Sequence, residues 1–240
     1  PDTSAAALRR ADRLFRGVRA ASSGHFQAIT NLPGVSLTIE GDYDVAADAQ
    51  ASTAIIRPTD AAPTTVRVVA ISDDMWVGLT AATPTGCWIH MDADDLSAVT
   101  GVQGVITPGA PSAVRAVFLA RSTGVRDGQV SARTSLLHVA GSVSGKLPLS
   151  LGITSTRGRT DVLIDVYEGR VTGLHADLGD LQADALAAGF KPQDRALRTP
   201  GSLSGHTLDV VFTGLDQDVA ITRPPADRVV ELSALENADG

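Results

Sequence analysis

The alternation of side chains between residues 35 and 45 constrains the fold more than any other part of the sequence. Apolar residues stand at every second position around Gly41, and polar or charged residues fill the positions between them: Leu37, Ile39, Tyr43 and Val45 against Ser36, Thr38, Glu40, Asp42 and Asp44. Neighbouring side chains of a strand point to opposite faces, so this segment predicts a strand with one buried and one solvated face. Such strands are typical of antiparallel sheets.

Further β-rich runs recur at the spacing of a meander or a barrel-like sheet. We expect additional strands at 50–57, 64–71, 75–79, 87–92, 133–144, 161–167, 170–178, 206–213 and 218–222. Apolar residues at helical spacing predict helices at 4–22, 111–121 and 180–188. No repeat or linker divides the chain. We therefore expect an α+β fold with one strongly curved antiparallel sheet in a single domain, residues 1–230, followed by a flexible tail, 231–240.

Charge and cysteine content exclude several classes of protein. The 240-residue chain has a formal net charge of −7, whereas a protein that binds nucleic acid usually has a basic surface. We therefore expect no nucleic-acid partner. A single cysteine, Cys87, rules out an internal disulfide framework and an all-cysteine metal cluster.

The search for catalytic motifs finds none that is complete. No two of the five histidines have the spacing of a helical zinc site, and HExxH is absent. The segment 141–146 resembles a phosphate-binding loop, but Leu147 stands where Ser or Thr would bind magnesium. Cys87 and His90 are three residues apart in a predicted strand, so they face opposite sides. Asp92, Asp94 and Asp95 are typical of a solvated turn. We therefore expect no enzyme, no cofactor and no metal.

The apolar face of the predicted sheet is the most informative feature for function. Eight or more strands with one apolar face offer more surface than two or three short helices can cover. The aliphatic residues are mostly small and only 4% of the chain is aromatic, which leaves room for a cavity that could hold a hydrophobic ligand. A core packed to ordinary density is the alternative.

The order of several short motifs resembles the LolA/LppX-like lipoprotein-carrier superfamily, in particular actinobacterial LppX/LprG-type lipoproteins. The similarity spans about residues 5–230 and rests on the order and spacing of segments that are individually weak signals: 22–26 (SSGHF), 39–43 (IEGDY), 73–77 (DDMWV), 87–92 (CWIHMD), 162–165 (VLID), 168–171 (EGRV) and 219–225 (VAITRPP). The resemblance implies a half-open β-barrel whose concave face is covered by helices. It also implies export to the cell envelope and a lipid anchor on a cysteine ahead of Pro1.

On this resemblance we expect a non-catalytic, monomeric carrier that binds a lipid or lipidated molecule and moves it across the envelope. Inward apolar residues would line its cavity: Leu37, Ile39, Tyr43, Ile55, Val68, Trp76, Phe118, Leu137 and Val139. The alternative is an envelope interaction or sensor module in which side chains fill the cavity and a protein partner binds outside.

The predicted helix at 4–22 has a strongly basic surface. Arg9, Arg13 and Arg16 lie beside its apolar stripe, as in helices that lie on anionic membranes. A solvated outer face of a helix packed on the sheet is the simpler interpretation. The sequence leaves peripheral membrane contact by these arginines as a hypothesis.

Overall fold

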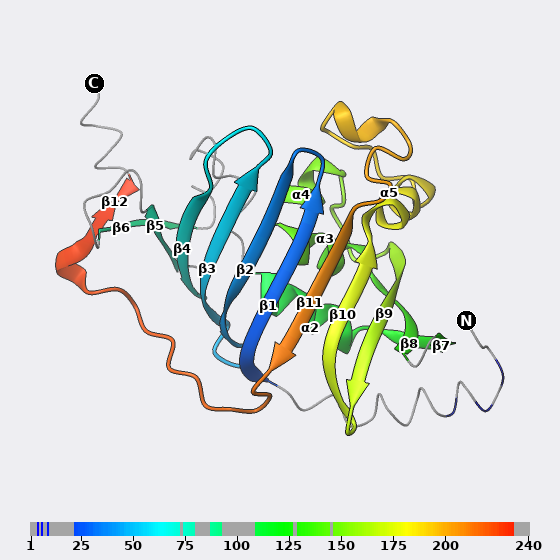
Figure 1. Ribbon diagram of the computed structural model, residues 1–240, viewed down its shortest axis with the longest axis horizontal. Helices are drawn as coiled ribbons and strands as arrows, with labels where there is room; N and C mark the ends of the chain where they lie inside the picture. The colour runs from blue at the N-terminus through cyan, green and yellow to red at the C-terminus, as the bar shows by residue number, and fades with distance from the viewer. Residues whose placement is uncertain are drawn as a thin grey trace.

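One long, open sheet organises the molecule (Figure 1). The computed structural model describes residues 22–72, 74–79, 87–92, 109–126, 129–144 and 146–232, together with Ser4, Ala6 and Arg9. Within these residues, 12 strands form a sheet in the order β12-β6-β5-β4-β3-β2-β1-β11-β10-β9-β8-β7. The edge strands β12 and β7 do not pair with each other, so the sheet is not closed.

The strands are numbered in chain order. They are β1 (Ser23–Leu32), β2 (Val35–Asp44), β3 (Ala49–Pro58), β4 (Thr64–Ile71), β5 (Asp74–Leu79), β6 (Trp88–Asp92), β7 (Arg121–Arg126), β8 (Gln129–Ser135), β9 (Arg159–Tyr167), β10 (Arg170–Asp177), β11 (Thr207–Thr213) and β12 (Val229–Glu231). Every neighbouring pair is antiparallel except β12 and β6, which are parallel. The sheet is therefore mixed, with a single departure from the antiparallel arrangement expected from sequence.

Four described α-helices accompany the sheet: α2 (Gly109–Phe118), α3 (Leu136–Val143), α4 (Lys146–Ser150) and α5 (Leu178–Ala187). Two short 3-10 helices, η2 (Ala196–Arg198) and η3 (Ala226–Arg228), lie in the C-terminal quarter. Helix α5 starts at Leu178 because the Asp177 side chain accepts hydrogen bonds from the backbone amides of Gly179 and Asp180, at 2.7 and 3.0 Å. The helices predicted at 111–121 and 180–188 are thus present with shifted ends.

Two expected strands are wrong. Within 133–144 the strand β8 ends at Ser135, and α3 follows as a helix. The buried apolar residues Leu136, Val139, Ala140 and Val143 have the spacing i, i+3, i+4 and i+7, which is that of one helix face, whereas on a strand they would divide between two faces. Segment 218–222 is irregular: it belongs to the stretch that runs from β11 to the far edge of the sheet, where β12 pairs with β6 (Figure 1).

The strands β1 and β7 are not among the predicted strands. In β1 the buried positions hold Ala28 and Thr30 beside Phe26, which gives a weak apolar signal. The N-terminal helix expected at 4–22 lies outside the described residues except for Ser4, Ala6 and Arg9, of which Ala6 and Arg9 are helical. The predicted tail is described only for Glu231 and Leu232.

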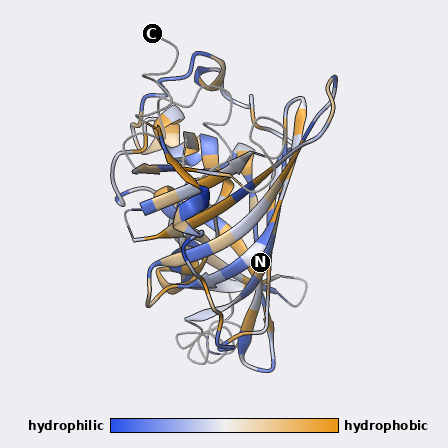
Figure 2. Cartoon of the chain, turned by 90° about the vertical axis from the view of Figure 1, so that its left-hand side faces the viewer, coloured by the Kyte–Doolittle hydropathy of each residue, from blue (hydrophilic) through white to orange (hydrophobic). Residues whose placement is uncertain are grey.

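The two faces of the sheet differ in character, as the alternating colours along the strands in Figure 2 show. We call the side that carries Phe26, Ile39 and Val66 the apolar face, and the side that carries His25, Glu40 and His175 the polar face. The strand register continues the apolar face across the whole sheet, since Ala28 pairs with Ile39, Ile39 with Ala54, and Ala54 with Val66. The larger core cluster joins this face to α2, α3, α4 and α5.

Candidate ligand-binding face

The centre of the apolar face is a set of three buried aromatic rings on β1, β2 and β11. Tyr43 packs edge-on against Phe26 and against Phe212, with ring centroids 6.3 and 5.9 Å apart. Burial, with a smaller effect of the Asp216 charge, raises the pKa of Tyr43 to about 12. The phenol therefore stays neutral in the physiological range and serves as part of an apolar wall.

Strand β2 supplies the first part of the predicted lining. Leu37, Ile39 and Tyr43 are all buried on the apolar face, as the alternation of 35–45 predicts. Gly41 lies between them, opposite Phe26 on β1 and Ser52 on β3. A Cβ atom at Gly41 would overlap the carbonyl oxygen of Ala51, so this glycine permits an unusually close approach of β2 and β3.

Helices supply the second part. Val139 of α3 is fully buried in the same cluster as the β2 residues, and Phe118 and Leu137 are half-buried against it. Leu137 and Val139 thus reach the apolar face from a helix, whereas the sequence analysis placed them on a strand. Beneath α3, side chains such as Val130 and Ala132 are fully buried, so this part of the face is filled.

Val68 lies on the same face but in a second, smaller cluster on β4, β5 and β6. Its members are Val66, Val68, Ala70, Met75, Val77, Ile89 and Met91, with Ile56 and Leu232 packed against it. Ile56 also packs against the larger cluster, so it links the two. The described helices belong to the larger cluster, and none of their residues is a member of the smaller one.

Ile55 and Trp76 lie on the opposite face. Ile55 lies between Ala54 and Ile56, which point to the apolar face, and it pairs with Thr38 and Thr65. Trp76 stacks on His90 with ring centroids 5.1 Å apart, and the Arg223 guanidinium lies 5.4 Å from its ring centroid. The structure therefore brings seven of the nine predicted lining residues to one face and separates these two from it.

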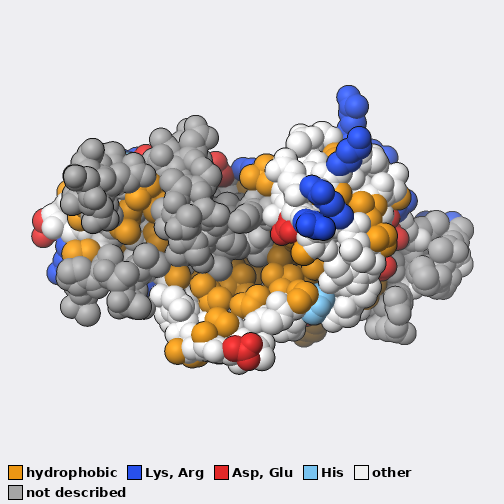
Figure 3. All heavy atoms as spheres, turned by 90° about the horizontal axis from the view of Figure 1, so that it is seen from above, with side chains coloured by type: hydrophobic (Ala, Val, Ile, Leu, Met, Phe, Trp, Pro, Cys, Tyr) orange, Lys and Arg blue, Asp and Glu red, His pale blue; other side chains and the backbone are white. Residues whose placement is uncertain are grey.

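One end of the molecule shows the apolar face from outside. Figure 3 looks down on the end where β1 finishes, and hydrophobic side chains gather there in a hollow. The strand ends at this side carry Leu32 and Ile56, both half-buried against the core. This hollow is where a hydrophobic ligand could reach the apolar face.

The polar face carries histidines enclosed by carboxylates. The Nδ1 and Nε2 atoms of His175 lie 2.7 Å from Asp209 and 2.6 Å from Asp165. Burial lowers the pKa of His175, but the hydrogen bonds to Asp165 and Asp209 outweigh burial and raise it. Both ring nitrogens are engaged, so His175 has no free nitrogen with which to act as a base or a metal ligand.

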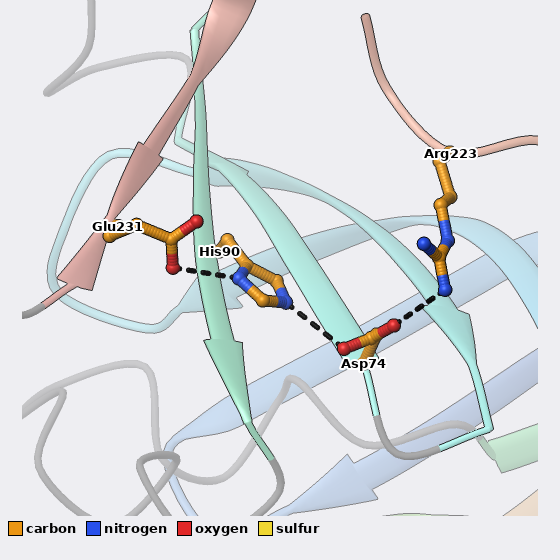
Figure 4. Close-up of polar contacts among 4 residues, drawn as sticks. All are labelled: Asp74, His90, Arg223 and Glu231. Atoms are coloured by element: carbon orange, nitrogen blue, oxygen red, sulfur yellow. Dashed lines mark hydrogen bonds and ion pairs between the residues drawn. The ribbon is translucent and has the colours of Figure 1, made fainter. Parts of the chain in front are cut away.

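His90 has a similar arrangement at the far edge of the sheet (Figure 4). Its Nδ1 lies 2.8 Å from Glu231 on β12 and its Nε2 lies 3.3 Å from Asp74 on β5, while Arg223 donates to Asp74 at 2.7 Å. Burial lowers the pKa of His90, and the contacts with Glu231 and Asp74 raise it overall. These contacts fasten the C-terminal segment to β5 and β6, a role that the sequence did not reveal.

Two further candidates, Cys87 and His138, lie in the described part of the chain. Cys87 is a half-buried free thiol. His138 lies half-buried on α3, where burial and the nearby charges of Arg115 and Arg159 lower its pKa. Within the described ranges, no three His, Cys, Asp or Glu side chains are placed to hold a metal ion.

Some predicted residues lie outside the described part of the chain, namely Arg13, Arg16, Asp94 and Asp95. Arg9 is described and exposed. Among the described helices, none has the length and apolar composition needed to cross a membrane. In comparisons with known proteins, the sequence matches no family model and no curated protein.

Proposed function

We propose that this chain is a non-catalytic carrier of the cell envelope that binds a lipid or another hydrophobic ligand against the apolar face of its sheet. The observation that carries the proposal is the continuity of that face from β8 to β6, together with the apolar hollow that opens onto it (Figure 3). The affinity would come from burial of acyl chain, at about 0.8 kcal/mol per CH₂.

A strongly curved, half-open barrel with helices on its concave side is part of the same proposal. Two observations support it. The contact between β2 and β3 at Gly41 is too close for a side chain, as at bends of a sheet. Residues of α2, α3 and α5 pack in one cluster with the apolar face.

The proposed ligand surface consists of the seven predicted residues that share this face. They are Leu37, Ile39, Tyr43, Val68, Phe118, Leu137 and Val139. The half-buried Phe118 and Leu137 are its accessible members, whereas Tyr43 and Val139 form its floor.

A chain-length series tests the carrier proposal. Saturated fatty acids of increasing length are titrated into the delipidated protein, and binding is measured by native mass spectrometry and calorimetry. Each added pair of methylenes should tighten binding by roughly tenfold until the acyl chain is longer than the apolar surface that holds it. Affinity that does not depend on chain length contradicts the proposal.

A matched pair of variants locates the ligand. Leu137→Ser should weaken binding because it places a hydroxyl on the apolar face, whereas Ile55→Ser on the polar face should leave binding unchanged. Both side chains are half-buried, so circular dichroism checks that each variant is folded. Equal effects of the two substitutions would argue against a site on the apolar face.

A second candidate is an interaction module with a filled core. The full burial of Val130 and Ala132 on β8 and of Leu136 and Val139 on α3 favours it. In that case, no lipid co-purifies with the protein or binds to it when added. Instead, the protein captures a partner protein from an envelope fraction, and the partner binds to the polar face.

A further inference from the structure

The segment 188–206 and the segment 146–159 contribute an unusual concentration of positive charge. Together they hold six basic residues, Lys146, Arg157, Arg159, Lys191, Arg195 and Arg198, and one acidic residue, Asp194. Both lysines of the chain are among them, although the chain as a whole has a net charge of −7. The charge of these two segments is therefore opposite in sign to that of the whole chain.

The backbone brings these two segments together. The amides of Gln193 and Asp194 donate to the carbonyl oxygen of Ser150 at 2.9 and 3.2 Å. A Cβ atom at Gly152 would overlap the Lys191 carbonyl, and one at Gly158 would lie 2.9 Å from the Phe190 ring. The two segments thus form one surface, which we call the basic end.

The described side chains of the basic end include five exposed cations. Arg157, Arg159, Lys191, Arg195 and Arg198 are exposed, and none forms an ion pair with a described residue. Arg115, Arg133, Arg170 and Arg223 elsewhere are all paired with aspartates. Arg198 is held by the carbonyl oxygens of Pro192 and Gln193, each at 3.2 Å, so it shapes the loop.

An exposed leucine accompanies these cations. Leu149 on α4 is 59% exposed, and it immediately precedes Ser150, the residue to which the loop is bonded. In Figure 3, basic side chains project from the end of the molecule beside the apolar hollow. Cations around an exposed apolar side chain suit the headgroup layer of an anionic bilayer, which attracts each basic residue and accepts the apolar one.

We propose that the basic end is the surface by which the protein docks on an anionic lipid membrane. Docking through the basic end would direct the apolar hollow toward the bilayer. The inference goes beyond the carrier proposal, because docking is measured without cargo. It also differs from the hypothesis about the N-terminal arginines, since it uses another surface.

Vesicle co-sedimentation with the full chain tests the proposal. The probes are vesicles of phosphatidylcholine with about one-third phosphatidylglycerol, and vesicles of phosphatidylcholine alone. Binding should require the anionic lipid and should fall steeply between about 0.05 M and about 0.5 M salt. Equal binding to both kinds of vesicle, or salt-independent binding, overturns the proposal.

Two pairs of variants with matched charge locate the surface. Lys191→Gln with Arg195→Gln should reduce partitioning about twentyfold, since each basic residue near such a surface contributes roughly fivefold. Arg121→Gln with Arg228→Gln removes the same charge from exposed positions on β7 and η3 that form no ion pair with a described residue, and it should change partitioning less than about twofold. Equal losses from both pairs overturn the proposal, and so does binding that the first pair leaves unchanged.

The apolar contribution has its own control. Leu149→Ser should weaken partitioning severalfold, whereas Tyr167→Ser should not, although Tyr167 is 67% exposed at the other end of β9 from Arg159. If the true partner is an acidic protein, the basic end should capture that protein and the chain should not bind vesicles. That result overturns the proposal of membrane docking. Native mass spectrometry of the variant with Lys191→Gln and Arg195→Gln separates the docking proposal from the carrier proposal. We expect this variant to lose membrane docking and to retain bound lipid.

Discussion

At the scale of single residues, the pKa values of His175 and His138 are shifted in opposite directions. The pKa of His175 is raised above its ordinary value of 6.5, because the hydrogen bonds to Asp165 and Asp209 outweigh burial. A group whose pKa is higher in the folded state contributes stability that is present below its unfolded pKa and lost as the pH rises through the folded pKa. The three strands that His175 joins should therefore be held more firmly at mildly acidic pH.

His175→Gln tests this linkage. The difference in unfolding free energy between the native protein and this variant should be largest below about pH 6.5 and should decrease above it, by less than about 1 kcal/mol because the site is partly solvated. His138→Gln is the control of opposite sign. Burial, with the charges of Arg115 and Arg159, lowers the pKa of His138, so the stability linked to it is lost as the pH falls below about 6.5. Urea unfolding across this range measures both, and parallel profiles would contradict the assignment.

Gly41 is the residue at which a single methyl group should matter most. A Cβ atom there would overlap the Ala51 carbonyl oxygen and crowd the Ser52 Cα and Cβ, so β2 and β3 would have to separate. We expect Gly41→Ala to lower the unfolding free energy by about 3 kcal/mol or more. At Gly78 the same atom would make ordinary contacts at 3.4 Å, so Gly78→Ala should cost less than about 1 kcal/mol. Similar denaturant midpoints for the two variants would mean that β2 and β3 are not closely apposed.

At the scale of elements, Gln182 connects α5 to the loop that forms the basic end. Its fully buried amide nitrogen lies 2.8, 3.0 and 2.8 Å from Leu197 O, Thr199 O and Ser202 Oγ, and its oxygen accepts from the Leu203 amide at 3.3 Å. Gln182→Leu would leave these loop groups unsatisfied, at a cost of about 2–4 kcal/mol. We expect faster hydrogen exchange across 196–203 in this variant. If the substitution speeds hydrogen exchange only within α5, other contacts hold the loop.

The elements also show how far the sequence predicts this structure. The alternation of 35–45 identifies β2 and its buried residues, because Leu37, Ile39 and Tyr43 are strongly apolar and their neighbours are charged. Leu137, Val139 and Val143 suit one strand face, but Leu136, Val139, Ala140 and Val143 have helical spacing, and these four are the apolar residues that α3 buries. The side of the sheet on which Ile55 and Trp76 lie depends on register. One partner of His90, Glu231, and one partner of His175, Asp209, come from strands that are distant in sequence.

At the scale of the whole molecule, the two clusters on the apolar face predict unequal stability along the sheet. The β9–β11 region is packed against α3 and α5, whereas the smaller cluster on β4–β6 is bordered at its edge by β12, a strand of three residues. Regions with fewer buried contacts open at lower free energy. We therefore expect the amides of β6 and β12 to exchange at a lower opening free energy than those of β10.

The fastening of β12 makes this prediction specific. Arg223 joins the C-terminal segment to β5 through Asp74 and the Trp76 ring, so Arg223→Gln should raise exchange at 229–231 and in β6 and leave β9–β11 unchanged. Arg170→Gln removes a comparable exposed ion pair, with Asp216, and should not affect β12. Hydrogen exchange read by mass spectrometry compares the two variants. If β12 and β10 exchange together in the native protein, the sheet opens as one unit, and the apolar face between β4 and β6 is reached only through the hollow at the end of the molecule.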